Sequence, residues 1–136
     1  MKIEITKLQL LSPLFYVSAE GLIPFEYREG DLLFCFELEE AQYRNFEPEG
    51  EAFFKNQVFA GKAVKGLSCG ELELPGGNYL FAQEREILSK GDTIAMALEI
   101  QKEGLWQRLK PGRRLYLRYL FEDGSPVTQL FRPYVE

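Results

Sequence analysis

The sequence predicts a single α+β domain made of two βαββ-like halves, whose strands form a mostly antiparallel sheet with helices on one side. Short runs of alternating apolar and polar residues recur along the chain, and one clear helical segment interrupts them in the second half. Both halves, approximately residues 1–66 and 67–136, end in paired strands after a candidate helix. The 136 residues match the usual size of one domain, so we expect 1–136 to share one core.

Composition narrows the classes of function. Apolar residues make up 46% of the chain, as in globular proteins, and the net charge is −5. A phosphate-binding surface needs clustered Lys and Arg, so direct nucleic-acid binding is not expected. The local basic cluster of Lys110, Arg113, Arg114 and Arg118 is interpreted as a solvated face of the sheet.

The chain contains no histidine and two cysteines, Cys35 and Cys69. Ser-His and Cys-His catalysis and histidine metal ligation are thereby excluded. Two cysteines are too few for a disulfide framework or a four-thiolate metal site, so we expect free thiols, no metal and no cofactor.

The first residues mix charged and apolar side chains and do not resemble a secretion signal. No run reaches the ~20 apolar residues of a membrane span. We therefore expect a cytoplasmic protein without membrane contact.

Strand patterns open the first half. Residues 3–10 alternate and predict a strand. Residues 12–21 are compatible with a short helix, begun by Ser12 and Pro13 and stopped by Gly21, or with a strand at 14–19 that its aromatic residues favour. Residues 32–39 form the clearest strand of this half; Leu32, Phe34, Phe36 and Leu38 share the face assigned to the core.

The rest of the first half is less regular. Pro48 is placed to open a short, weak helix that reaches residue 55. Residues 57–65 return to strand character, and Gly61 within them indicates a bulge or a close backbone approach.

The second half is organised around a turn. Two alternating runs, 71–74 and 78–83, flank Pro75, Gly76 and Gly77, which predicts a hairpin. A largely buried helix follows over 93–103, with Asp92 as its cap and Gly104 as its stop. Residues 105–109 are expected to be extended, and residues 110–113 to form a turn.

Two strands close the chain. Residues 114–121 alternate with a core face of Leu115, Leu117, Tyr119 and Phe121. Asp123 and Gly124 are typical of a hairpin turn, and residues 127–134 form the last strand. Pro133 indicates a strand near the sheet edge.

The order of these motifs resembles a known family. The run from Glu73 to Phe81, the helix ending in Gly104, the strand with Tyr116 and Tyr119, and the run from Leu130 to Val135 are similar to the gyrase-inhibitor-like small-molecule-binding domain. That domain is also the effector-binding domain of AraC- and MerR-type regulators. The resemblance covers residues 57–136; the position of the family's pocket glutamate matches Leu117 here.

The resemblance implies a stand-alone effector-binding domain, a sensor or sequestering protein, because no helix-turn-helix segment accompanies it. It implies a concave pocket between the halves for a small apolar or aromatic molecule. The lining residues expected are Trp106, Tyr79, Tyr116 and Tyr119, with Glu37 or Glu122 as polar partners. Equally, these side chains suit ordinary core positions.

Two other functions stay open. An acidic surface or an exposed sheet edge could dock a protein partner or act as an inhibitor module. The acidic residues that motivate this are Glu37, Glu39, Glu40, Glu47, Glu49 and Glu51. A small-molecule hydrolase is the third possibility, but without the pocket glutamate we expect a protein that is not an enzyme.

Overall fold

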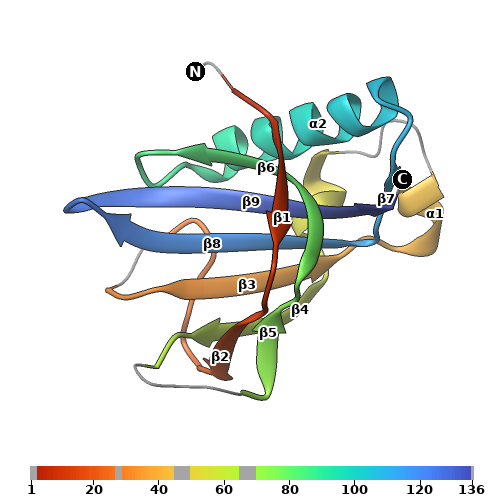
Figure 1. Cartoon of the computed structure of the whole chain (residues 1–136). Helices are drawn as coiled ribbons and strands as arrows, with labels where there is room; N and C mark the ends of the chain where they lie inside the picture. Colours follow the sequence, from red (N-terminus) through yellow and green to blue (C-terminus); the bar gives the residue numbers. More distant parts are fainter. Residues whose placement is uncertain (1–2, 27–28, 45–49, 65–69, 136) are drawn as a thin grey trace.

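The computed structural model of the chain describes residues 3–26, 29–44, 50–64 and 70–135. It shows a strongly curled antiparallel sheet with helices on one side (Figure 1). The elements in order are β1 (Thr6–Leu10), β2 (Leu14–Ser18), β3 (Leu32–Glu37), α1 (Glu40–Arg44), the 3₁₀ helix η1 (Gly50–Phe54), β4 (Gln57–Lys62), β5 (Leu72–Leu74), β6 (Gly77–Glu84), α2 (Lys90–Trp106), β7 (Lys110–Pro111), β8 (Arg114–Glu122) and β9 (Ser125–Val135).

The strands of the two halves interleave in one sheet, in the order β1-β6-β9-β8-β3-β4-β2-β5, with β7 on β9. The first half contains three strands, then α1 and η1, then β4, an order that differs from the expected βαββ. The second half has two strands before α2 and two long strands after it, as expected, but β5 and β6 do not pair with each other. A duplicated unit stays a prediction.

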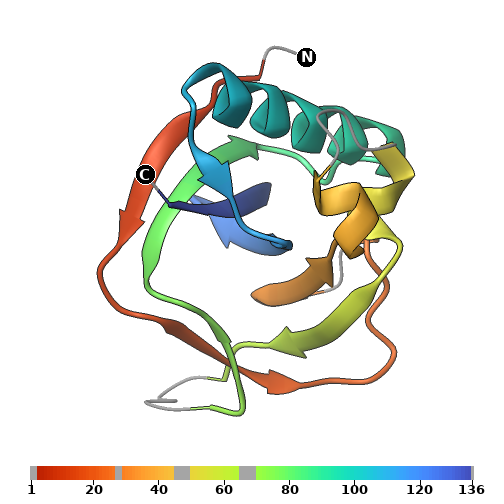
Figure 2. The same ribbon diagram turned by 90° about the vertical axis from the view of Figure 1, so that its right-hand side faces the viewer.

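The sheet closes on itself through two bent segments. β1 leads directly into β2, and β5 leads directly into β6; β1 pairs with β6, and β2 pairs with β5. β2 also pairs with β4, and β6 with β9, so the sheet returns to its starting strand, as Figure 2 shows end-on. The curl therefore gives the sheet an inner concave face and an outer face.

Both faces bury side chains, which explains the strong curl. The inner cluster includes Leu33, Cys35 and Phe131. The outer cluster packs under α2 and η1 and includes Phe34, Leu117 and Leu130. Because side chains alternate along a strand, β3, β8 and β9 contribute to both clusters and need cover on both sides.

The predicted hairpin at residues 75–77 is wrong, although its two strands are present. β5 and β6 each pair with another strand, and residues 75–77 form a corner between them. At Gly76 an added Cβ would lie 3.2 Å from the carbonyl oxygen of Leu10, so the two bends cross closely. The turn residues thus predicted the change of direction correctly, but they did not predict which strands pair.

Helix α2 is longer than predicted at both ends. Its N-cap is Ser89, whose Oγ accepts a hydrogen bond from the backbone N–H of Asp92 at 3.1 Å, so Asp92 is not the cap. Gly104 lies inside the helix, where an added Cβ would be 3.2 Å from Leu80 on β6. The helix continues to Trp106, so residues 105 and 106 are helical and not extended. The left-handed backbone conformation predicted for Gly104 at the helix end is found instead at Arg108, with φ 59°.

Most of the other predicted elements are confirmed. Residues 14–18 are a strand, which decides between the two alternatives there. η1 takes the place of the weak helix, with Pro48 outside the described residues, and the predicted turn at 110–113 contains the short strand β7. Asp123 and Gly124, both with positive φ, connect β8 to β9.

Two details of the last strands differ from expectation. β9, which carries Pro133, pairs on both sides, with β6 and β8, and is not an edge strand. Phe121 is exposed, although Leu115, Leu117 and Tyr119 on its face are buried.

Gly61 is the close approach that the sequence indicated. An added Cβ there would lie 2.7 Å from the carbonyl oxygen of Val17 and 2.9 Å from Leu72. We predict that Gly61→Ala lowers the free energy of unfolding by about 1–3 kcal/mol, because the backbone of β2 must move away. Urea denaturation measures the change.

The matched control is Gly91→Ala in the first turn of α2, where no atom lies nearer than 4.0 Å to the added Cβ. This variant should be neutral or more stable by up to about 1 kcal/mol. Equal effects at the two glycines would contradict the packing argument.

Candidate functional site

The structure brings together two of the six predicted site residues. Tyr79 and Tyr116 meet edge to face on the concave side, with ring centroids 6.3 Å apart, and Tyr79 also packs on Phe131. Both rings are buried, and the hydroxyl of Tyr79 donates a hydrogen bond to the carbonyl oxygen of Pro75. Burial raises the pKa of both phenols, which therefore stay protonated at neutral pH.

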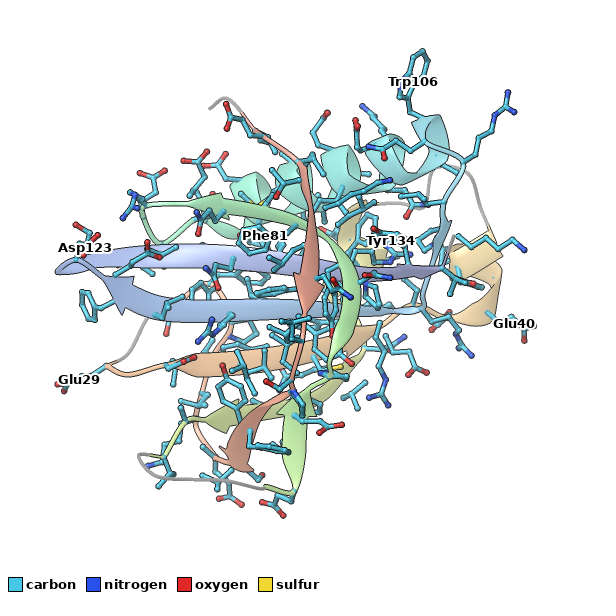
Figure 3. The ribbon with its side chains drawn as sticks, viewed as in Figure 1. Glu29, Glu40, Phe81, Trp106, Asp123 and Tyr134 are labelled. Carbon is cyan, nitrogen blue, oxygen red and sulfur yellow. The ribbon has the colours of Figure 1, made fainter. Side chains whose placement is uncertain are left out.

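The other four lie elsewhere. Tyr119 is buried on the outer face, where its hydroxyl accepts a hydrogen bond from the N–H of Phe25. Trp106 is 84% exposed and projects from the end of α2 (Figure 3). Glu37 forms ion pairs with Arg113 and Arg114 at one end of β3, and Glu122 pairs with Arg85 near the β8–β9 turn.

The acidic residues of the first half do not present one uniform surface. Glu37 is compensated by two arginines, and Glu39 lies 3.7 Å from the ammonium group of Lys55. Glu47 and Glu49 lie outside the described residues. Docking of a protein partner on this segment stays a prediction.

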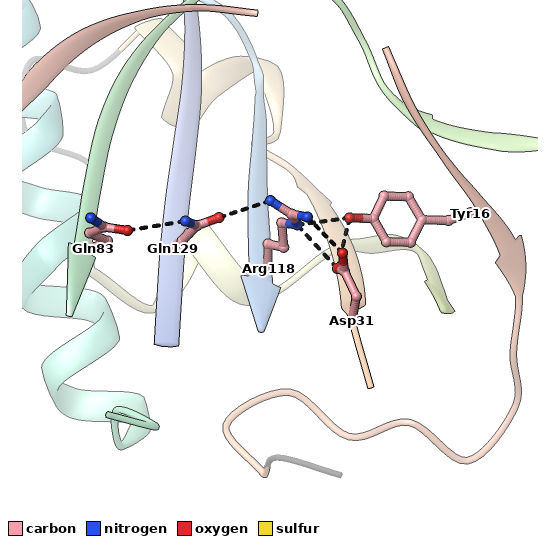
Figure 4. A network of polar contacts seen from close by, with 5 residues as sticks. All are labelled: Tyr16, Asp31, Gln83, Arg118 and Gln129. Atoms are coloured by element: carbon pink, nitrogen blue, oxygen red, sulfur yellow. Dashed lines mark hydrogen bonds and ion pairs between the residues drawn. The ribbon is translucent and has the colours of Figure 1, made fainter. Parts of the chain in front are cut away.

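A connected polar network that the sequence did not predict crosses the concave face (Figure 4). Its centre is Arg118, whose Nη2 donates to Oδ2 of Asp31 at 2.6 Å and whose Nε donates to the hydroxyl of Tyr16 at 2.9 Å. The Tyr16 hydroxyl donates to Oδ1 of Asp31 at 2.8 Å. On the other side, Nη1 of Arg118 donates to Gln129 at 3.2 Å, and Gln129 donates to Gln83 at 3.1 Å.

The strand register explains why these residues meet. Gln83 is opposite Gln129 in the β6–β9 ladder, and Gln129 is opposite Arg118 in the β9–β8 ladder. Asp31 directly precedes β3, which pairs with β8. The predicted solvated face for Arg118 is therefore wrong: its side chain is only 17% exposed, and that of Asp31 is 26% exposed.

Tyr16 and Arg118 both keep their protons at neutral pH, because the pKa of each is raised. Burial is the main cause of the raised pKa of Tyr16, so its hydroxyl is a hydrogen-bond donor. Burial opposes the charge of Arg118, but Asp31 and Tyr16 outweigh it and raise the pKa of the guanidinium group. Tyr16 and Arg118 thus present fixed donors and a fixed positive charge.

A cavity of about 380 Å³ adjoins one end of this network. Phe81 and Gln83 contribute to its wall; the first also packs against the inner cluster, and the second is the last member of the network. The remaining lining residues are polar or charged: Glu4, Thr6, Glu84 and Arg85. A volume of this size accommodates a small organic molecule.

A second cavity, of about 360 Å³, lies on the helix side near α1, η1 and the start of α2. Its walls carry both signs of charge, including Glu39, Glu51, Lys55 and Lys90. We regard the cavity at Gln83 as the candidate site, because Gln83 connects it to the partly buried network through Gln129 and Arg118.

Cys35 is a free thiol buried in the inner cluster, and burial raises its pKa to about 11. It is therefore unreactive at neutral pH. Cys69 lies outside the described residues. In the described part of the chain, no group of three or more Cys, Asp and Glu side chains could hold a metal ion.

No model of a known protein family matches the chain, and no curated protein matches it. The resemblance to the gyrase-inhibitor-like domain stays a prediction. Among the residues that the structure describes, no helix is both long and apolar enough to cross a membrane.

We predict that Asp31→Asn destabilises the protein by about 2 kcal/mol, because Arg118 loses its counter-charge in a largely buried position. The combined variant Asp31→Asn with Arg118→Met should cost less than the sum of the single changes, and urea denaturation of all four proteins gives the coupling. Additive effects would contradict the network. Lys102→Met, which removes an exposed pair with Glu99, should change stability by at most about 0.5 kcal/mol.

The pKa of Cys35 also predicts a loss of stability at alkaline pH. In the unfolded chain the thiol ionises near its ordinary pKa of 9.0, whereas in the folded protein it ionises near 11. The protonated thiol therefore contributes fully to the free energy of unfolding below pH 9. This contribution is lost as the pH rises towards 11, by up to about 1.4 kcal/mol per pH unit. Urea titrations between pH 8 and 10 should show this decline, and Cys35→Ala should make it shallower.

Proposed function

We propose that this chain is a small-molecule-binding domain whose ligand occupies the cavity beside Gln83. The observation that carries the proposal is the continuity between that cavity and the partly buried network of Gln129, Arg118, Asp31 and Tyr16. A ligand that bonds to the amide of Gln83 would change the hydrogen bond between Gln83 and Gln129. A satisfied buried network can pass such a change onwards because its members are held in fixed geometry.

The cavity lining favours a particular ligand chemistry. Two carboxylates, Glu4 and Glu84, face one guanidinium group, Arg85, which is already paired with Glu122. The net charge of the lining is negative, so it attracts a protonated amine. Phe81 offers an aromatic surface, and Thr6 and Gln83 offer hydrogen-bonding groups. We therefore propose an arylalkylamine, an aromatic ring that carries a protonated amino group on a short aliphatic chain, as the ligand class.

The role that follows is sensing or sequestration, in agreement with the function that the resemblance implies. Tyr16 and Arg118, whose pKa values are both raised, do not titrate near neutral pH to supply acid-base catalysis. The proposal uses the cavity at the end of β6 rather than the aromatic pocket first expected around Tyr79 and Tyr116, whose rings are packed inside the concave face.

The test is a titration of ¹⁵N-labelled protein with tyramine, followed by NMR, with benzoate as a probe of opposite charge. Tyramine should shift the backbone amides of Thr6 and Gln83 and the side-chain Nε–H of Arg118, and benzoate should not. Tryptophan fluorescence is a poor reporter here, because Trp106 is exposed at the end of α2.

The double variant Glu4→Gln with Glu84→Gln should weaken tyramine binding at least fivefold, since each charged contact contributes about 1 kcal/mol. Glu99→Gln, on the exposed side of α2, is the matched control and should leave the affinity unchanged. Equal binding of tyramine and benzoate, or shifts spread over all acidic surfaces, would refute the proposed site.

A further inference from the structure

Arg132 on β9 is a fully buried arginine on the outer face of the sheet, with 0% of its surface exposed. Its Nε donates a hydrogen bond to the carbonyl oxygen of Gly112 at 2.7 Å, and its guanidinium group lies over the ring of Phe53, 5.8 Å from the centroid. The two terminal nitrogens, Nη1 and Nη2, have no hydrogen-bond partner among the described residues. This face is opposite to the one that carries the Arg118 network.

The guanidinium group keeps its charge at neutral pH. Burial lowers its pKa to about 10, and the nearby Tyr43 opposes this only partly, so the group is almost fully protonated at pH 7. No ion pair in the described part of the chain includes it. An isolated buried charge is strongly unfavourable, so a counter-charge or bound water has to compensate it.

The contacts that do exist orient the free side of the group. The hydrogen bond from Nε to Gly112 and the ring of Phe53 fix the guanidinium plane, which leaves the Nη1 and Nη2 edge free. Two parallel N–H donors on one edge match the two oxygens of a carboxylate or phosphate.

We propose that Arg132 is the anchor of a buried oxyanion site between the sheet and the helices, which takes a small carboxylate or phosphate group. The anion binds to Nη1 and Nη2 as a bidentate ligand. η1 covers this place with Phe53 and packs on α2 and β3. The site is separate from the cavity at Gln83 and does not depend on the proposed function.

The test measures the stability of the full chain by urea denaturation at pH 7 and constant ionic strength, with chloride replaced by phosphate or by acetate. Binding to the folded state alone lowers the unfolding constant about tenfold when the anion concentration reaches ten times its dissociation constant. We expect a saturable effect of at least one of the two anions, and the one that acts identifies the chemistry. No difference from chloride overturns the proposal.

Three variants locate the effect. Arg132→Met should abolish the saturable anion response, and Arg132→Lys, which keeps a charge without the fork, should weaken it at least tenfold. Arg108→Met is the matched control, because it removes an exposed arginine and should leave the response intact. A response that persists in Arg132→Met would overturn the proposal.

Two further measurements test the same site. If the variants at Arg132 do not fold, a titration of ¹⁵N-arginine-labelled wild type with phosphate and acetate should shift one slowly exchanging Nε–H signal; no such shift overturns the site.

The variant Glu47→Gln with Glu49→Gln tests an internal source of the charge, since these acids lie between α1 and η1 in the sequence. If the wild type lacks an anion response and this variant gains one, the counter-charge is internal and a free-ligand site is excluded.

Discussion

The fold depends on one constraint: the central strands β3, β8 and β9 carry apolar side chains on both faces. One face of such a sheet can be covered by helices, and α2 with η1 does so over Phe34, Leu117 and Leu130. No second layer of helices is available in the described chain for Leu33, Cys35 and Phe131. The sheet covers that face with itself, by curling until β2 and β5 complete the circuit. The bends at residues 11–13 and 75–76 follow from this need, because two long strands have to turn the same corner together.

Local chemistry accounts for much of what the sequence could predict. Alternation located the strands near residues 32, 57, 78, 114 and 127, and the positive φ of Asp123 and Gly124 is what an Asp-Gly pair favours. Pairing could not be read in this way. Pro75 and the glycines after it indicate a change of direction, and a corner needs the same residues as a hairpin. The partner strand decides between them, and it lies in the first half of the chain.

For a similar reason Gly104 was mistaken for a helix end: a glycine that allows close packing on Leu80 has the same sequence signal as one that terminates a helix.

The candidate site was harder to predict, because its members are distant in sequence. Tyr16, Asp31, Gln83, Arg118 and Gln129 come from five separate segments. Strand register aligns Gln83, Gln129 and Arg118, and side-chain hydrogen bonds join Arg118 to Asp31 and Tyr16. A signal was nevertheless present, since Arg118 and Gln129 each interrupt a strand whose neighbours on the same face are apolar. A polar residue at such a position has to find partners across the sheet. Aromatic residues were a weaker guide, as the different positions of Trp106 and Tyr79 show: one is exposed at a helix end and the other fills the core.

Arg118 on β8 and Arg132 on β9 lie on opposite faces of the sheet, and the two faces compensate a buried positive charge differently. Arg118 is partly accessible and has an aspartate, a tyrosine and a glutamine around it, so its burial is compensated by contacts that span the concave face. Arg132 is more deeply buried and has one carbonyl oxygen and one aromatic ring. Desolvation costs more for the more deeply buried charge, so Arg132 would be expected to have more hydrogen-bond partners than Arg118. Instead Arg118, the less buried of the two, has more. Among the described residues, the concave face therefore carries a hydrogen-bonded polar network, whereas the helix-covered face retains two unpaired donors on Arg132.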